Sequence, residues 1–299
     1  MKKYIASIMV MAAALAMVSC SGEETPTPLY HSPAPFYMPA DTATDATSQL
    51  RREFYSRTGS YLLFNDTIQK NYLGTDINGD DVYSCETLDL AYTIGYSLAG
   101  INTYSFTYVT DYESQKAMTD FIDEYVLYHF TGKIKPFLYF ICKTITLTYR
   151  NGSVSSPYAS SGQRGVAIAA NYLLSKKRTE SQKKAYAERI LSAMIGQLAN
   201  NYSEYFTDFY AYSSSYYNNY WTYYGDDRDS TLASLGFIGI GTYAISCPGQ
   251  SEDLNQYALA TIQYSADDWA KKYADYPVVV EKYNFMRRVL SELGFVYDE

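Results

Sequence analysis

Apolar residues recur at helical spacing in three stretches of the chain. These stretches are 114–130, 179–199 and 276–297, and in each the apolar positions fall three or four residues apart. That period places them on one face of an α-helix. Thr179 is a suitable cap for the second stretch, and Gln182 stands at the position that reaches back to the cap. The apolar face of this stretch comprises Ala187, Ile190, Leu191, Met194, Ile195 and Leu198. The pattern predicts three amphipathic helices, the second of them buried.

Other apolar runs are shorter and rich in β-branched and aromatic residues, which favours strands. They occupy 59–66, 135–149 and 164–175, and Cys142 lies in the second run, where a buried thiol is expected. Residues 49–57 have the character of a helix start. The hydrophobic pattern therefore predicts an α+β fold that is mainly helical and contains a small sheet.

A polar segment, 75–86, separates two of these elements. Asp76, Asn78 and Asp80 alternate as calcium ligands do in an EF-hand loop. The sixth position of that loop needs Gly and the twelfth needs Glu, whereas this chain has Asp81 and Thr87 there. The segment is therefore interpreted as a solvated turn rich in Asp and Asn.

The N-terminus has the pattern of an export signal. Lys2 and Lys3 precede a short apolar run, Ile5 to Val18, which is too short to span a bilayer comfortably. Small residues and Cys20 follow. The pattern predicts a lipoprotein signal peptide, residues 1–19, with Cys20 lipidated after cleavage and the mature protein held at a membrane. The alternative is an ordinary secretory peptide with an unrelated cysteine.

Residues 20–48 are dominated by Pro, Thr, Ser and Ala, which predicts a flexible tether. Residues 49–299 are then expected to form a single domain. The first residues of the tether, "CSGEE", resemble the acidic export signal that follows the lipid-bearing cysteine in surface lipoproteins of some Gram-negative anaerobes. The resemblance implies an outer-membrane protein that is displayed at the cell surface.

Composition excludes some functions. Hydrophobic residues make up 47% of the chain and charged residues 19%, so a substantial core is expected. The net charge is −8 and the pI is about 4.9, which argues against a surface that binds nucleic acid. No phosphate-binding loop, dinucleotide fingerprint or G-x-S-x-G motif is present. No cofactor is predicted.

Tyrosine is unusually abundant, with 35 copies. Six aromatic residues fall within residues 216–224, with Asn218 and Asn219 between them. Rings alternating with amides suit a surface that stacks on a glycan or a peptide, although a Tyr-rich loop packed on its own domain has the same composition. The candidate ligand-binding residues are Tyr216, Tyr217, Tyr220, Trp221, Tyr223 and Tyr224.

Histidine is scarce, and this limits the possible chemistry. The chain has two, His31 and His129, which are far apart, so a His-Glu-x-x-His zinc site is impossible. His129 lies near the end of a predicted helix, where a structural role is expected. With Cys20 lipidated, three cysteines remain, and their spacing matches no zinc module.

Three pieces of the sequence, in this order, resemble the zinc-binding metallopeptidase-like lipoproteins of gut-type Gram-negative bacteria. The first is "FIDEYVLYHFTGKIKPFLYFI", a helix followed by a strand. The second is "LGFIGIGTYAISCPGQSEDLNQYA", with Gly-Phe, Tyr-Ala and Glu252-Asp253 at the start of a helix. The third is the closing helix, "YPVVVEKYNFMRRVLSELGF". The resemblance implies a zincin-like fold over residues 49–299.

In that family a helix ahead of the aromatic segment carries His-Glu-x-x-His. Placed on residues 192–196, the motif meets Ser192, Ala193 and Gly196 in place of the ligands and the general base. The resemblance implies that Glu252 or Asp253 once completed the site. One carboxylate cannot hold a catalytic zinc, which needs about three protein ligands. No metal and no catalytic residue are therefore expected.

These observations favour a surface lipoprotein that resembles a zinc metallopeptidase but binds without catalysis. One alternative is a structural or interaction lipoprotein in which the aromatic rings are simply core. Another is a hydrolase that uses paired carboxylates. Its candidate residues are Asp226, Asp227, Asp229, Glu252 and Asp253.

Overall fold

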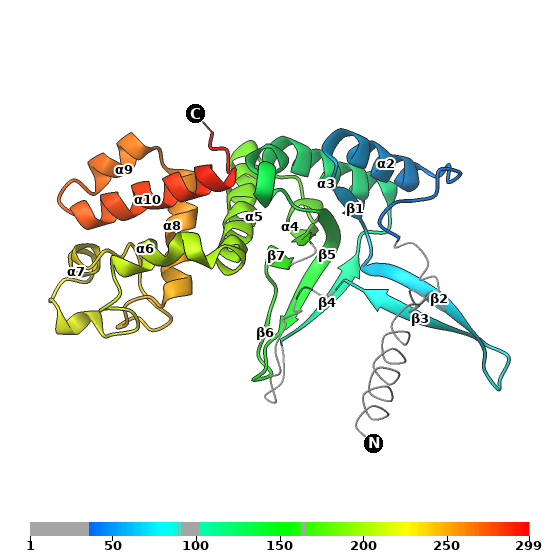
Figure 1. The fold of residues 1–299 in the computed structure, drawn as a ribbon, viewed down its shortest axis with the longest axis horizontal. Coiled ribbons are helices and arrows are strands. Elements are labelled where there is room, and N and C mark those ends of the chain that lie inside the picture. The colour runs from blue at the N-terminus through cyan, green and yellow to red at the C-terminus, as the bar shows by residue number, and fades with distance from the viewer. Residues whose placement is uncertain (1–35, 89, 91–101, 163–164, 299) are drawn as a thin grey trace, which may run out of the picture. The chain divides into compact units, whose positions relative to one another are not determined.

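The computed structural model describes residues 36–88, 90, 102–162 and 165–298, with the side chains of 199 and 200 left aside (Figure 1). The predicted signal peptide, Cys20 and His31 lie outside these residues. Within them the chain is an α+β protein in which helices predominate over strands. A six-stranded mixed sheet and a separate two-stranded hairpin make up the β structure.

The end of the predicted tether is ordered, which corrects the boundary at residue 48. Helix α2 spans Ala46–Thr58, and the Asp45 side chain caps it by accepting a hydrogen bond from the N–H of Ser48. Upstream of the cap, the guanidinium of Arg51 donates to the carbonyls of Phe36 and Tyr37. These contacts fix residues whose composition alone suggested a flexible chain.

Strand β5, Leu138–Thr148, is the centre of the sheet. Its first half pairs in parallel with β1, Tyr61–Leu63, on one side and with β8, Gly165–Ala169, on the other. Its second half pairs antiparallel with β4, Thr103–Tyr108, and with β6, Val154–Ser155. The predicted strand at 135–149 is confirmed, and it is the longest of the described strands.

The sheet is buried on both faces at its centre. Tyr139 and Ile141 of β5 join the larger core cluster, whereas Leu138, Phe140 and Cys142 join a second cluster on the other face. Such alternation follows from the two-residue period of a strand. The predicted burial of Cys142 is confirmed, because its side chain has no exposed surface.

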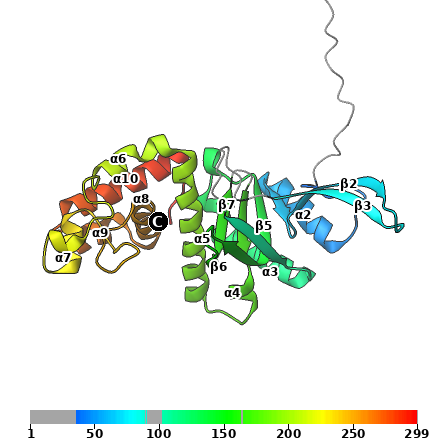
Figure 2. The same cartoon turned by 90° about the horizontal axis from the view of Figure 1, so that it is seen from below.

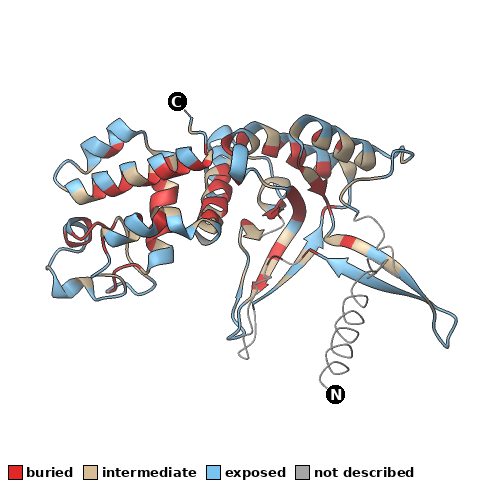
Figure 3. Ribbon diagram, in the orientation of Figure 1, coloured by how far each residue is buried: buried red, intermediate tan, exposed pale blue. Residues whose placement is uncertain are grey.

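The polar segment 75–86 belongs to a hairpin of β2, Thr67–Thr75, and β3, Asp81–Thr87. At its turn the carboxylate of Asp76 accepts hydrogen bonds from the N–H groups of Asn78 and Asp80. The predicted Asp- and Asn-rich turn is therefore confirmed. Most of the hairpin is exposed (Figure 3).

The first predicted amphipathic helix is α3, Tyr112–Tyr125, followed by two short 3₁₀ turns, Leu127–His129 and Gly132–Ile134. His129 is buried, and its Nδ1 lies 2.6 Å from the carbonyl oxygen of Val296. Since a carbonyl only accepts hydrogen bonds, Nδ1 carries the ring proton. The predicted structural role of His129 is confirmed.

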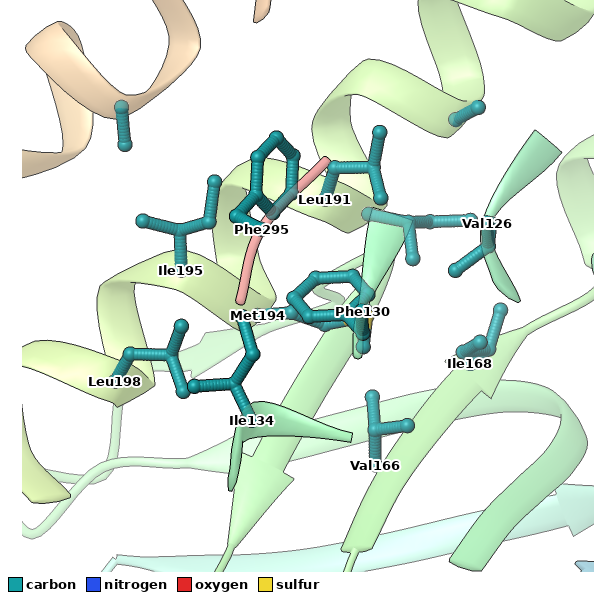
Figure 4. Close-up of a cluster of buried hydrophobic side chains, with 14 of the residues drawn as sticks. Val126, Phe130, Ile134, Val166, Ile168, Leu191, Met194, Ile195, Leu198 and Phe295 are labelled. Atoms are coloured by element: carbon teal, nitrogen blue, oxygen red, sulfur yellow. The ribbon is translucent and has the colours of Figure 1, made fainter. Parts of the chain in front are cut away.

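The second predicted helix is α5, Glu180–Asn201, which follows the short α4, Asn171–Leu174. The expected capping box forms between Thr179 and Gln182. Leu191, Met194 and Ile195 point into a cluster with residues of the sheet and of the C-terminal segment (Figure 4). Helix α5 therefore packs between the sheet, at β7, Ala159–Gly162, and the helix α8, Gln250–Gln263 (Figures 1 and 2).

The remaining elements are short helices and the closing helix. After α5 come the 3₁₀ turn Ser203–Phe206, α6, Thr207–Ala211, the turn Trp221–Tyr223 and α7, Arg228–Ser234. After α8 come α9, Ala266–Lys272, and the predicted third helix, α10, Pro277–Leu293. A small core cluster comprises Leu232, Leu235, Phe237 and Cys247. None of the described helices combines the length and the apolar character needed to cross a membrane.

Candidate functional site

A cavity of about 530 Å³ lies where α5, α8 and β7 meet. Ser192, Ala193 and Gly196 of α5 line it, so the positions matched to the zinc motif face a cavity. They lie beside the buried stripe of the same helix, because Leu191 and Ile195 are turned into the core. The hydrophobic pattern of α5 therefore orients this polar face toward the cavity.

The cavity holds no set of metal ligands. Its described lining includes Ser, Ala, Gly, Gln, Asn, Tyr, Leu and Arg side chains and none from His, Cys, Asp or Glu. Throughout the described part of the chain, no three residues of those four types gather in a way that would hold a metal ion. Metal-assisted chemistry needs such ligands, and the residues that form this cavity do not provide them.

At the second histidine position of the motif, Gly196 allows α8 to approach closely. A Cβ atom at Gly196 would lie 2.3 Å from Oδ1 of Asn255. The Asn255 carboxamide thus occupies the space into which a side chain at 196 would project. Ser192 is one turn away, and its hydroxyl lies 3.5 Å from the carbonyl oxygen of Asn255.

Glu252 and Asp253 are absent from the lining of this cavity, although the residues on either side of them, Ser251 and Leu254, belong to it. Glu252 instead accepts a hydrogen bond from the N–H of Gly249 at the start of α8, and another from the Thr242 hydroxyl. Both contacts satisfy the helix start and its neighbouring loop. The structure thus brings together Ser192, Ala193 and Gly196 but separates them from the two acidic residues.

Asp253 forms a fully buried ion pair with Lys282 of α10. The Lys282 ammonium lies 2.6 Å from Oδ2 of Asp253, and neither side chain has exposed surface. Tyr217 donates a hydrogen bond to the same oxygen, at 2.7 Å. Burial raises the pKa of Asp253 and lowers the pKa of Lys282, whereas their mutual attraction opposes both shifts. This pair holds α8 against α10, and neither residue lines the cavity.

One wall of the cavity is the edge of the sheet. Among the described strands, β7 pairs with β8 alone. The N–H of Ala169 donates to the carbonyl of Tyr158. In an antiparallel pair, residues alternate between those whose peptide groups bond to the partner strand and those whose peptide groups point away from it. It follows that the peptide groups of Ala159 and Ser161 face away from β8. Both residues line the cavity, and Leu90 lies beside the end of the strand.

Among the described residues that line the cavity, Arg189 is the one that carries a charge. Its guanidinium donates to the Tyr158 hydroxyl at 3.0 Å and lies 5.2 Å from the centre of that ring. Elsewhere in the lining, the Ser160 hydroxyl donates to the Tyr104 hydroxyl at 2.8 Å. Sequence reasoning missed these residues, and it also missed Asn255. The run "YASSG" that forms β7 has no apolar alternation, so only the tertiary structure identifies it as a strand.

The tyrosine-rich segment is divided between core and surface. Tyr216, Tyr217 and Trp221 pack against the small core cluster of Phe237 and Cys247. Tyr220, Tyr223 and Tyr224 are exposed by 44%, 72% and 44%. Half of the predicted ligand-binding residues thus support the fold, and the other half are available to solvent.

Four of the five candidate acids of a hydrolase are engaged by neighbouring groups. The Asp227 side chain accepts the N–H of Ser230 at the start of α7, and Asp229 pairs with Arg228 at 2.7 Å. Asp226 is exposed. Glu252 and Asp253 are engaged as described above. No pair of these carboxylates faces the other across the cavity between α5, α8 and β7.

Comparisons of the chain with protein-family models, with curated proteins and with solved structures found no match.

Proposed function

We propose that this protein is a surface lipoprotein with a zincin-like fold that binds an extended peptide without cleaving it. The bound segment lies in the cavity between α5, α8 and β7. The observation that carries the proposal is the composition of that cavity. Among the described residues, the edge of β7 away from β8 has no strand partner and faces hydroxyl and carboxamide side chains, and none of the described lining residues is a metal ligand.

The described residues of the cavity support binding without catalysis. Peptide hydrolysis needs an activated water or an activated nucleophile. The cavity has serine hydroxyls, but its described lining residues include no base to accept their protons. His129, the described histidine, is buried and bonded to the Val296 carbonyl. These residues support binding rather than reaction.

An extended peptide is favoured over a compact ligand by the open edge of β7. The outward N–H and C=O groups of Ala159 and Ser161 suit the addition of another strand. Arg189 adds one positive charge at the cavity, which favours an acidic side chain or a terminal carboxylate. The alternative of a purely structural lipoprotein gives no reason for a polar cavity of this size beside an open edge.

The test uses a phage-displayed random dodecapeptide library, selected on the full-length protein in detergent. Binding of the selected peptides is then measured by fluorescence polarisation. Ala193→Phe fills the cavity and should weaken binding at least about tenfold, which corresponds to ~1.4 kcal/mol. Ser161→Pro removes one N–H from the open edge and should also weaken binding.

The matched control is Ala185→Phe, on an exposed position of the same helix, which should bind as the parent does. Mass spectrometry should find the peptides intact after incubation with and without Zn²⁺. If no peptide is selected, or if Ala193→Phe binds equally well, the peptide proposal is wrong. Cleavage in the presence of Zn²⁺ would instead refute the non-catalytic assignment.

The membrane attachment is part of the same proposal and rests on residues 1–24. Lipidation of Cys20 at the outer membrane would place the domain at the cell surface. Cys20→Ala should release the protein from the membrane fraction, as judged by fractionation and by loss of labelled palmitate. Retention of Cys20→Ala in the membrane would show that another feature anchors the chain.

A further inference from the structure

Five large side chains form an exposed patch away from the cavity, here named the tyrosine patch. Its members are Tyr220, Tyr223, Tyr224, Tyr243 and Ile245, whose exposed fractions are 44%, 72%, 44%, 71% and 50%. Large side chains that are exposed together on one surface indicate an interaction site, whereas scattered ones are ordinary.

The two segments that carry the tyrosine patch lie side by side. The N–H of Trp221 donates to the carbonyl of Ile245 at 3.1 Å, and the N–H of Cys247 donates to the carbonyl of Asn219 at 2.7 Å. Tyr220 and Ser246 form an antiparallel bridge between these two bonds. Residues more than twenty positions apart are therefore brought into one surface.

Contacts with neighbouring side chains and backbone restrain the rings of the tyrosine patch. The Trp221 indole N–H donates to the Ala244 carbonyl at 3.0 Å, which fixes the second segment against the first. Tyr224 meets the half-buried Tyr216 edge to face, with ring centres 5.3 Å apart. Tyr220 and Tyr223 meet in the same manner at 5.4 Å. Rings restrained in this way lose little conformational entropy when a ligand binds.

We propose that the tyrosine patch binds a neutral polysaccharide. The C–H faces of a pyranose ring are apolar and stack on aromatic rings, whereas its hydroxyl groups need hydrogen-bonding partners at the edge. Tyrosine provides both, since each ring carries a hydroxyl. The exposed Asn218 and Thr222 add an amide and a hydroxyl within the same segment.

The charges near the tyrosine patch decide between neutral and anionic glycans. Asp226, Asp227 and Asp229 follow the patch directly and are exposed. Arg228 is the one cation among them, and it pairs with Asp229 at 2.7 Å. This acidic surrounding repels a polyanion and leaves neutral sugars as the matching class.

The experiment is affinity electrophoresis of the full-length protein in detergent, through gels that contain soluble xyloglucan, galactomannan, mixed-linkage β-glucan or dextran. Retardation by at least one of them is expected, and polygalacturonate should retard the protein less. Isothermal titration with the retarding polysaccharide then gives affinities. Tyr223→Ala should weaken binding about tenfold, equivalent to ~1.4 kcal/mol. Tyr223→Phe, which keeps the ring, should stay within about threefold of the parent.

The matched control is Tyr72→Ala, which removes an exposed ring from β2 and should leave binding unchanged. The proposal is overturned if none of the neutral polysaccharides retards the protein, if polygalacturonate binds best, or if Tyr223→Ala and Tyr72→Ala have equal effects. Peptide binding by Ala193→Phe and by Tyr223→Ala, measured in parallel, keeps this proposal separate from the cavity. A failure here leaves the peptide proposal standing.

Discussion

At the scale of single residues, His129 links stability to pH. Burial lowers the pKa of its ring, and the hydrogen bond with the Val296 carbonyl and the nearby Asp298 offset only part of this effect. The unfolded chain therefore binds a proton at higher pH than the folded chain does. The contribution of His129 to the free energy of unfolding should be fully present above pH 6.5, the ordinary pKa of histidine. It should be lost as the pH falls below that value.

The measurement is the melting temperature of the parent and of His129→Gln between pH 7.5 and 5.5. Gln has no proton to gain in this range, and its amide still has a donor for the Val296 carbonyl. The parent should lose more of its melting temperature across the range than the variant does. Equal slopes for the two proteins would show that His129 does not carry this pH dependence.

The three described cysteines should differ in reactivity. Cys85 is exposed, whereas Cys142 and Cys247 are buried. Burial raises the pKa of the Cys142 thiol to about 12 and that of Cys247 to about 11, so both remain protonated at neutral pH. In a Cys20→Ala background, a thiol reagent such as DTNB should modify one thiol in the native protein and three after denaturation. Rapid labelling of more than one native thiol would contradict this burial.

At the scale of elements, substitutions in α5 show whether the hydrophobic face of this helix serves packing alone. Leu191 and Ile195 are 2% and 0% exposed. Leu191→Asp or Ile195→Asp places a carboxylate among apolar side chains, and each should lower the free energy of unfolding by about 3–5 kcal/mol. Ser192→Ala, beside them on the cavity face, should change it by less than about 0.5 kcal/mol. Urea denaturation measures all three, and silent Asp variants would refute the burial of this face.

The long periodic elements were predictable because their pattern coincides with their burial. The stripe of α5 and its cap at Thr179 identify that helix, and the apolar content of 135–149 identifies the central strand. By contrast, β7 is a strand only because β8 pairs with it. Arg51 likewise orders the segment before α2 through contacts with distant backbone carbonyls, and composition does not record such contacts.

The cavity was predictable only in part, for the same reason. Its α5 wall follows from the helical period, since Ser192, Ala193 and Gly196 adjoin the buried stripe. The α8 wall depends on which face of that helix packs inward. Asp253 points to Lys282 rather than to the cavity, so the resemblance that placed it beside Ser192 and Gly196 did not predict its position. Asn255, two residues further on, takes the place beside Gly196.

At the scale of the whole described domain, the ion pair of Asp253 and Lys282 joins four separate parts of the chain. Lys282 donates to Oδ2 of Asp253, to the Ser213 hydroxyl and to the Gly236 carbonyl, the last two at 3.0 Å. Four aromatic rings surround its ammonium, with centres 4.7 to 5.8 Å away. Removing either charge therefore disturbs α8, α10 and both connecting segments together.

Removal of the Lys282 charge and removal of the Asp253 charge should lower the free energy of unfolding by different amounts. Without Lys282, the Asp253 carboxylate keeps Tyr217 as a partner, while its Oδ1 is already buried with no partner among the described residues. Without the Asp253 charge, Lys282 keeps two oxygens and the aromatic rings. Lys282→Met should therefore lower the free energy of unfolding by about 3–5 kcal/mol, and Asp253→Asn by less, because a cation retains more compensation here than the anion does.

The double variant Asp253→Asn/Lys282→Met completes a thermodynamic cycle. Once both charges are gone, neither residue leaves an uncompensated charge in the core. The double variant should therefore lose less free energy of unfolding than the two single variants lose together, by about 1–3 kcal/mol. Guanidinium denaturation of the four proteins gives this coupling. Additive costs would mean that the two residues stabilise the domain independently. A larger loss for Asp253→Asn than for Lys282→Met would mean that the aromatic rings do not compensate the ammonium, and that the pair alone holds α8 to α10.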